Sequence, residues 1–433
     1  MSRPLSTIEH LIDGCIVYAI RLEGELDETR LRAALARVQA KHPALRATLQ
    51  AHGAGLRYVD DSAGPIPLRV APLRGGDDGR READLELETP FACGCPQLRL
   101  VWLHGVGRHE LLFAASHRIC DGMSLLIVAR ETLKALHDAS PLLPYAALTA
   151  RDIVGDYRPE HPRRRRWTAR AIGLLLRLLP PMAAPVNREH HVEWSAGPVL
   201  SSALRQRCKR EQVSVHAALL VALDEALLTA LGREQVPAWI ESPMDGRRGR
   251  VPALADDRLF YGGGGLKFRT GQDNDRDYWE RVRGAHDSMQ AQIERESRDI
   301  PSRYHFCDLI RPPAASQLNA LVRLGNALGL KGSWNRITLS NLGQIDLVGD
   351  EAPFRLEDFR LYVHSHSVHA LGLLVYALHG QIRFYFMGDR SCIEFDRIQA
   401  LRDALMAVLA AQVERVHAVA VPAVQVGDAT CAS

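Results

Sequence analysis

The sequence predicts an α/β (α+β) fold built from two similar halves. The chain has 433 residues, of which 46% are hydrophobic and 24% are charged, a composition and length that suit two globular domains with separate cores. In each half, short β-rich runs alternate with helical apolar patterns. Between the halves, the composition changes sharply in a segment that is first basic and then rich in proline.

This segment divides the chain. It begins at Arg163, continues through Leu174-Leu175-Leu176 and ends in the prolines between residues 180 and 185. The division assigns residues 1–160 to an N-terminal subdomain, 161–197 to a basic and apolar crossover linker, 198–420 to a C-terminal subdomain and 421–433 to a tail that we expect to fray.

The N-terminal half is predicted to begin with a helix over residues 28–42. Asp27 is a suitable N-cap, Glu28 lies in the first turn, and Pro43 prevents the helix from continuing. Strands are then expected near residues 56–60, 66–71, 97–104 and 110–116. Helices therefore alternate with a mixed sheet.

The C-terminal half repeats this style. Ser214 is expected to cap a helix whose apolar residues share one face and which ends at Gly232. The elements predicted after it are a strand at 238–240, a hairpin of strands 373–378 and 381–387 that turns at His379-Gly380, and a terminal helix at about 396–415.

Residues His117 to Gly122, with the sequence His-Arg-Ile-Cys-Asp-Gly, carry the clearest indication of chemistry. They follow an apolar run and precede a helical pattern, which predicts a strand-to-helix turn. In such a turn a neutral imidazole can act as a general base, and a carboxylate four residues later can hold the loop. Gly122 suits a backbone position with no room for a Cβ atom. By itself, the pattern also fits a structural histidine beside an acidic helix cap.

Further motifs accompany this one in a familiar order. They are Pro4 to Glu9, His42 to Arg46, Thr89-Pro90-Phe91 before Leu98-Arg99-Leu100, Ser242 to Arg248, and Ser340-Asn341-Leu342-Gly343. Together they resemble the chloramphenicol acetyltransferase-like superfamily, which includes condensation domains of nonribosomal peptide synthetases, alcohol O-acetyltransferases and polyketide-associated acyltransferases. In that family residues Leu31 to Arg46, which include this run, would form the first helix and the strand after it. The resemblance covers residues 4–415.

The resemblance implies two chloramphenicol acetyltransferase-like subdomains in a V-shaped pseudo-dimer, with an active-site tunnel at their junction and His117 near its middle. Members of the family join an activated acyl group to an alcohol or an amine. By that resemblance His117 is the general base, Asp121 and Gly122 complete the motif, and Asp121 pairs with an arginine. The matching arginine is Arg247, or Arg248 if the register differs by one.

The resemblance also places the Ser340-Asn341 segment beside the tunnel, as a loop after a strand at 336–339. There Ser340 and Asn341 are candidates for stabilising an oxyanion or positioning the substrate. The alternative is a turn that bonds its own backbone.

One residue departs from the usual pattern of peptide-forming condensation domains. These carry two adjacent histidines, whereas Ser116 precedes His117 here. The substitution favours the alcohol-acylating and stand-alone branches. The chain has no Gly-x-Ser-x-Gly motif, so no acyl-enzyme is expected, and Cys120 is the one cysteine placed within the motif.

The expected partners follow from the donor that the resemblance implies. No permanently bound cofactor is expected, since the donor is an acyl thioester on the phosphopantetheine of a carrier protein or on coenzyme A. The acceptor is a small alcohol or amine. Clustered arginines, at 163–166 and at 247, 248 and 250, can dock an acidic carrier or a phosphate, although a solvated charged surface explains them equally well. We expect a monomer.

Other classes of ligand are disfavoured. The net charge of +3 gives no reason to expect nucleic acid. His364, His366 and His369 raise the question of a metal, but no carboxylate or cysteine completes a site in the sequence, so no metal is expected. The eight cysteines show neither zinc nor disulfide spacing, and the N-terminus lacks a signal-peptide core, which together favour the cytoplasm.

The apolar stretch at 169–186 is broken by arginines and prolines, so it is not expected to span a membrane. Its apolar residues can instead line a substrate entrance or touch a membrane surface. The leading hypothesis is a stand-alone acyltransferase of secondary metabolism that forms an ester or an amide. The alternatives are a non-catalytic condensation-like module that binds a carrier and recruits a partner enzyme, and an epimerase acting on a carrier-bound residue.

Overall fold

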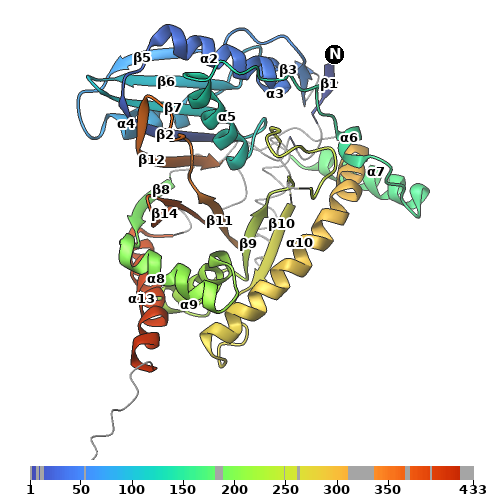
Figure 1. Cartoon of the computed structure of the whole chain (residues 1–433). Coiled ribbons are helices and arrows are strands. Elements are labelled where there is room, and N and C mark those ends of the chain that lie inside the picture. The colour runs from blue at the N-terminus through green and yellow to red at the C-terminus, as the bar shows by residue number, and fades with distance from the viewer. Residues whose placement is uncertain are drawn as a thin grey trace, which may run out of the picture.

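A computed structural model of the chain describes residues 2–5, 9, 14–52, 55–180, 189–247, 249–260, 264–310, 336–365, 371–390 and 393–419. The two halves of the chain form two α/β bodies, one above the other in Figure 1. Each has its own hydrophobic core. The predicted α/β (α+β) fold with two subdomains is therefore confirmed.

The N-terminal body is built on a five-stranded sheet of order β12-β2-β7-β6-β5. Its central strands are buried on both faces, because α4 packs on β2 and β7 and α5 packs on β7. The elements of this body are β2 (Gly14–Gly24), α2 (Glu28–Lys41), β5 (Leu68–Pro72), α4 (Asp78–Glu88), β6 (Leu98–His104), β7 (Arg108–Ser116) and α5 (Gly122–Ala135).

A small sheet of order β1-β4-β3 lies in the same half, with β1 at Ser2–Pro4, β3 at Thr48–His52 and β4 at Gly55–Val59. The chain enters it through a short helix, α3 (Pro43–Arg46). The strand expected after the first helix within residues 31–46 therefore begins later, with β3 at Thr48. Pro43 occupies the first turn of α3, where its fixed φ suits a helix and its missing N–H costs nothing.

The C-terminal body contains a six-stranded sheet of order β10-β9-β11-β13-β14-β8. The central helix α9 is buried almost all round, between the sheet and the helices α10 and α13. The elements are β8 (Glu189–Ser195), α8 (Gly197–Arg210), α9 (Val215–Leu231), β9 (Trp239–Met244), β10 (Gly264–Arg269), α10 (Tyr278–Leu309), β11 (Arg336–Gln344), β13 (Leu371–Leu378), β14 (Gln381–Asp389) and α13 (Phe395–Val419).

One strand of the C-terminal half joins the sheet of the N-terminal body. β12 (Phe354–Ser365) comes from the C-terminal half but pairs along its whole length with β2, at the edge of the N-terminal sheet. The segment assigned to the linker, 161–197, holds the helix α7 (Pro162–Leu178) and then β8, which pairs with β14. The boundaries at 160 and 198 therefore do not coincide with the sheets: β8, within the linker range, belongs to the C-terminal sheet, and β12, after residue 198, belongs to the N-terminal one. The predicted tail at 421–433 lies outside the described residues.

Local signals in the sequence correspond to observed caps and turns. The Asp27 side chain accepts a hydrogen bond from the Arg30 N–H, and Ser214 accepts one from the Ala217 N–H. His379 and Gly380 both have positive φ, at 48° and 76°, as a two-residue hairpin turn of this kind requires.

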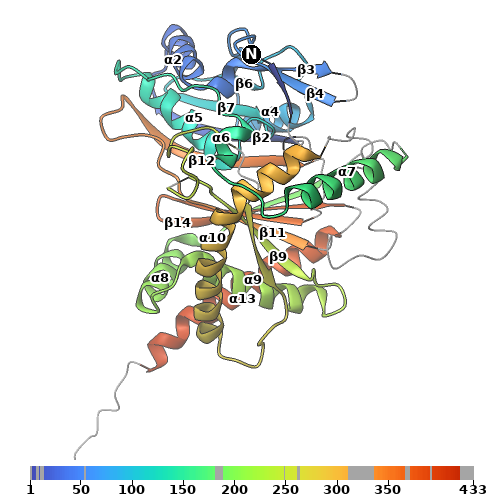
Figure 2. The ribbon, with the colours of Figure 1, turned by 90° about the vertical axis from the view of Figure 1, so that its right-hand side faces the viewer.

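The long helix α10 runs past both bodies (Figure 2). It contacts α9 and β10 in the C-terminal body and the short helix α6 (Ala150–Val154), and its last turn packs against α7. Within the described part of the chain, no single helix has the length and apolar character needed to cross a membrane. The helices α8 and α9 meet that test only when taken together, across a bend of 111°.

Candidate active site

The motif occupies the turn between β7 and α5, as the sequence predicted. β7 ends at Ser116, and α5 begins at Gly122. The backbone N–H of His117 donates to the Gly14 carbonyl at 3.0 Å, which ties the turn to the first residue of β2. The base candidate thus lies directly after β7, next to the start of β2.

The hydrogen bond of His117 fixes its tautomer. Nδ1 lies 2.9 Å from the carbonyl oxygen of Cys120, and a carbonyl can only accept, so Nδ1 carries the proton. In the neutral ring the lone pair is then on Nε2. Burial lowers the pKa of His117, and this outweighs the bond to Cys120 and the nearby Asp121 carboxylate, which both raise it. The ring is therefore neutral at pH 7 and able to take a proton at Nε2.

Asp121 caps α5 and is half-buried. Its Oδ1 accepts from the backbone N–H and the hydroxyl of Ser124, both at 2.7 Å. Its two carboxylate oxygens also meet the guanidinium of Arg247, with Oδ1 to Nη2 and Oδ2 to Nη1 both 3.1 Å. The structure thus places the predicted arginine on the predicted aspartate in a two-point ion pair. Arg248, the alternative partner, lies outside the described residues.

Arg247 is 1% exposed, and its guanidinium is fully bonded. Nε donates to the Arg258 carbonyl at 2.7 Å, Nη1 to Asp245 at 2.9 Å and Nη2 to the Phe260 carbonyl at 3.1 Å. Burial alone would lower the pKa of Arg247, but the carboxylates of Asp121 and Asp245 raise it overall. Because Arg247 follows β9 in the C-terminal body, the pair also joins the two halves of the molecule.

Gly122 has no room for a side chain. Its carbonyl accepts a hydrogen bond of 2.9 Å from the hydroxyl of Tyr18 on β2. A Cβ atom at this position would lie 2.8 Å from that hydroxyl oxygen and 3.1 Å from Cδ2 of Leu342. The close approach of Tyr18 therefore accounts for the glycine.

The segment Ser340 to Gly343 is not a loop after a strand, so that expectation is corrected. It lies within β11, where Ser340 and Asn341 pair with β13, and a bulge follows between Asn341 and Gln344. Gly343 takes the left-handed φ of 75° that the bulge requires, and its N–H donates to Asn341 Oδ1 at 2.9 Å. Asn341 thus makes the local backbone bond considered as the alternative role. Leu342 is the residue of this segment that reaches the motif.

Three residues that support the site escaped sequence reasoning. Ser124 bonds both Asp121 and Arg247, Tyr18 bonds Gly122, and the Phe260 backbone accepts from Arg247 at its carbonyl and donates its N–H to the Ser124 oxygen. Ser124 had a usable signal, because the third residue after an N-cap aspartate commonly bonds it. Tyr18 and Phe260 had none, since their contacts join strands and loops far apart in the sequence.

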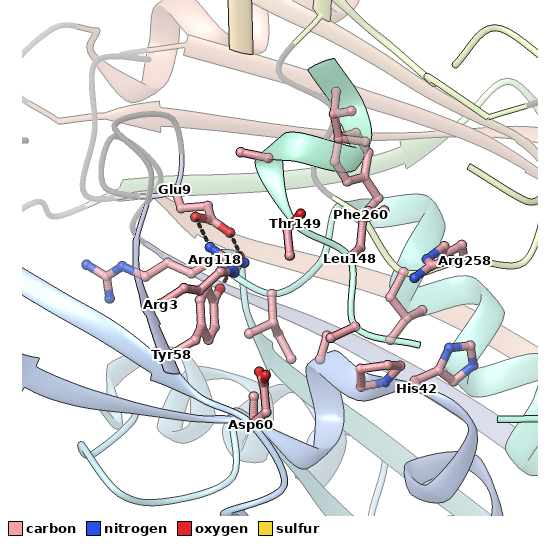
Figure 3. Close-up of a pocket in the computed structure, with 18 of the residues that line it drawn as sticks. Arg3, Glu9, His42, Tyr58, Asp60, Arg118, Leu148, Thr149, Arg258 and Phe260 are labelled. Carbon is pink, nitrogen blue, oxygen red and sulfur yellow. Dashed lines mark hydrogen bonds and ion pairs between the residues drawn. The ribbon is translucent and has the colours of Figure 1, made fainter. Parts of the chain in front are cut away.

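A pocket lies beside the motif, at the junction of the two bodies (Figure 3). Arg118 and Ile119 of the motif line it, together with Leu259, Phe260 and Tyr304 from the C-terminal half. Arg3, Glu9, Tyr58 and Arg118 gather at one end, and His42 and Arg258 lie at the other. The cavity therefore offers both ionic and apolar surface beside Arg118 and Ile119, while His117 is not among the described residues that line it.

Cys120 is unsuited to nucleophilic attack. It is 2% exposed, and burial raises the pKa of its thiol, to which the nearby Asp121 carboxylate adds. Only the thiolate is a strong nucleophile.

The histidines considered for a metal are only partly within the described residues. His364 Nδ1 lies 3.1 Å from Oε2 of Glu189, while His366 and His369 lie outside. Across the residues that the structure describes, no group of three or more His, Cys, Asp or Glu side chains is arranged to hold a metal ion.

Solved structures share this fold over nearly the whole chain. Polyketide synthase associated protein 5 from Mycobacterium tuberculosis superimposes with a TM-score of 0.64, covering 95% of this chain and 98% of its own, at 15% identity. The first condensation domain of the calcium-dependent antibiotic synthetase gives 0.66, with 95% and 96% covered, at 16% identity. The EpoB cyclization-docking bidomain from Sorangium cellulosum gives 0.63, with 96% and 85% covered, at 19% identity. The chain therefore has the chloramphenicol acetyltransferase-like condensation fold.

Curated sequences match shorter parts of the chain. Cyclosporin synthetase simA from Tolypocladium inflatum is 30% identical over 253 residues, which is 53% of this chain and 2% of that protein. The nonribosomal peptide synthetase CymA from Salinispora arenicola is 37% identical over 120 residues, or 27% of this chain and 2% of its own length. No protein-family model matches the chain. The chain thus spans a small fraction of the synthetases it resembles.

Proposed function

We propose that this chain is an acyltransferase that moves an acyl group from a thioester to an alcohol or an amine, with His117 as the general base. The observation that carries the proposal is the bond from His117 Nδ1–H to the Cys120 carbonyl, which leaves the lone pair on Nε2 of a ring whose pKa is lowered. The fold that the chain shares with condensation domains supports the same reaction class.

In the proposed reaction, Nε2 of His117 takes the proton from the hydroxyl or amine of the acceptor. At the same time, the oxygen or nitrogen of the acceptor bonds to the carbonyl carbon of the thioester. The tetrahedral intermediate then collapses, the carbon–sulfur bond breaks, and the thiolate receives the proton from His117. The product is an ester or an amide and a free thiol. No acyl-enzyme forms, in keeping with the buried Cys120.

Asp121 supports the reaction without touching the substrate. Both of its oxygens are engaged by Arg247 and Ser124, so the carboxylate is a positioning group rather than a second base. By fixing the start of α5, it holds the backbone of the loop whose Cys120 carbonyl sets the tautomer of His117. Geometry of this kind is held before the substrate arrives.

Asn341 and Ser340 remain candidates for stabilising the oxyanion or positioning the substrate. Asn341 Oδ1 is engaged by the Gly343 N–H, so the group that Asn341 offers a substrate is its Nδ2 donor. A donor is the type of group that a developing negative charge requires. Loss of this donor in Asn341→Ala should lower kcat more than it raises KM.

The donor in this proposal is an acyl thioester on a carrier protein or on coenzyme A, and no resident cofactor takes part. The second candidate is a non-catalytic condensation-like module that binds a carrier and recruits a partner enzyme. It is favoured by the fold that the chain shares with a polyketide synthase associated protein.

Intact-mass spectrometry distinguishes the two functions. The purified protein is offered matched acyl-carrier and acyl-coenzyme A donors with pooled alcohols and amines, beside His117→Ala. Product that forms only with His117 present supports the acyltransferase and names its donor and acceptor classes. Carrier binding without product from any donor and acceptor would favour the recruiting module.

A further inference from the structure

Helix α7 presents two opposite apolar faces. Ala169, Gly173 and Leu176 are buried against the end of α10 and Ile310. On the other side, the large apolar residues Trp167, Leu174, Leu175 and Leu178 are exposed by 69%, 62%, 61% and 73%. The spacings of seven and four residues place Trp167, Leu174 and Leu178 on one stripe of the helix, and Leu175 lies beside it, about 100° further round. Nothing among the described residues covers this stripe to any large extent.

The charge of α7 is of one sign. The helix contains six arginines, at positions 163–166, 170 and 177, and no aspartate or glutamate. Arg166, Arg170 and Arg177 line one groove along the helix together with Leu174 and Leu309. The guanidinium of Arg170 lies 5.7 Å from the centre of the Trp167 ring. A cationic row therefore runs directly beside the exposed apolar stripe.

The position of α7 suits contact with an extended surface. In both views it lies at the side of the molecule, and in Figure 1 it projects beyond the end of α10. Because its inner face is already occupied by α10, the exposed stripe points outward from the body. The stripe therefore does not line an entrance formed by the described residues.

We propose that α7 binds the surface of an anionic phospholipid bilayer and lies in the plane of that surface. Trp167 and the three leucines would enter the boundary between headgroups and acyl chains, while Arg166 and Arg170 meet lipid phosphates. A helix that combines a Trp and Leu face with arginines is the type that binds membranes in this way. A bilayer is favoured over an acidic protein because four large apolar side chains accompany the charges along the helix.

Cosedimentation of the full chain with vesicles tests the proposal. The vesicles are pure phosphatidylcholine or phosphatidylcholine mixed with phosphatidylglycerol. Binding is expected to the anionic vesicles, to weaken with added salt, and to be much weaker to the neutral ones. Leu174→Gln with Leu178→Gln, and separately Arg166→Gln with Arg170→Gln, should each lower the partition constant by about tenfold or more.

A matched control is available on other exposed surfaces. Val199 and Leu143 are 82% and 77% exposed, so Val199→Gln with Leu143→Gln makes an equal change in surface polarity away from α7. The partition constant of this control should equal that of the unaltered chain. Equal binding by the leucine variant, or no binding of the unaltered chain to anionic vesicles, overturns the proposal. Loss of carrier-protein binding in the arginine variant, without vesicle binding by the unaltered chain, would assign α7 to a protein partner instead.

Discussion

The carboxylate of Asp121 and the guanidinium of Arg247 are joined by two hydrogen bonds, each 3.1 Å long, across the junction of the two bodies. Asp121 belongs to the motif that carries the base candidate, and Arg247 follows the strand β9 of the other half. One ion pair thus fixes the start of α5 and links the halves, so its loss should affect both stability and turnover.

Asp121→Ala should lower the free energy of unfolding by up to about 3 to 5 kcal/mol, because it removes the cap of α5 and one of the two carboxylates paired with the buried Arg247, leaving only Asp245. Asp121→Asn should cost less, since an asparagine still caps the helix. Urea denaturation measures both, with the exposed Asp273→Asn as the control. An unchanged midpoint in Asp121→Ala would show that the pair does not stabilise the fold.

His117→Ala should reduce turnover by about 100-fold to 10,000-fold, the range for loss of a general base. The fold should survive, because the alanine keeps the backbone N–H bond of residue 117 to the Gly14 carbonyl, which ties the turn to β2. Turnover and the urea midpoint are measured together, with the exposed His52→Ala as the control. Turnover close to that of the unaltered protein would remove His117 from its proposed role.

The pH dependence of turnover follows from the lowered pKa of His117. The base acts only when neutral, and burial keeps it neutral below the pH of about 6.5 at which an ordinary histidine is half protonated. Therefore kcat/KM should reach half of its plateau value at a pH below about 6.5. A half-maximal rate at or above that pH would contradict the assignment.

Stability should also fall in acid, through buried histidines outside the motif. Burial lowers the pKa of His216 and of His191 to about 4. Between about 4 and 6.5 the unfolded chain then binds more protons than the folded chain, so the free energy of unfolding falls as the pH is lowered through this range. His216→Gln should make the decline between pH 7 and pH 5 shallower in urea titrations. An equally steep decline would mean that His216 does not remain neutral when folded.

Gly122→Ala should destabilise the protein by about 1 to 3 kcal/mol, the typical cost of overpacking. The new Cβ would lie 2.8 Å from the Tyr18 hydroxyl oxygen, which is held on a buried strand. Tyr18→Phe removes that oxygen and should rescue part of the loss. If the two substitutions simply add in thermal unfolding, the clash is not with Tyr18.

The sequence predicted most of the local structure, because the signals for helix caps, hairpin turns and the motif loop are local. The Asp27 and Ser214 caps and the His379-Gly380 turn depend on neighbours within three residues. Errors arose where pairing over long distances decided the outcome. The Ser340-Asn341 segment became part of β11 because β13 pairs with it, and no local signal in the segment shows that partner.

The site divides in the same way. The pairing of Asp121 with Arg247 came from family resemblance, since 126 positions separate them in the chain. Neither Tyr18 nor Phe260 was expected at the site, because a tyrosine in a strand and a backbone carbonyl in a loop carry no distinguishing pattern. Contacts of this kind become visible only when the sheets have been assembled.

The pairing of β12 with β2 has a consequence for how the molecule is made. The edge of β2 stays open until residues 354–365 have left the ribosome, so the N-terminal sheet cannot close while the first three-quarters of the chain are being synthesised. An open strand edge pairs readily with other chains. The order of synthesis therefore leaves the half that carries His117 incomplete and prone to aggregate until the rest of the protein arrives, which also makes that half a poor choice for expression alone.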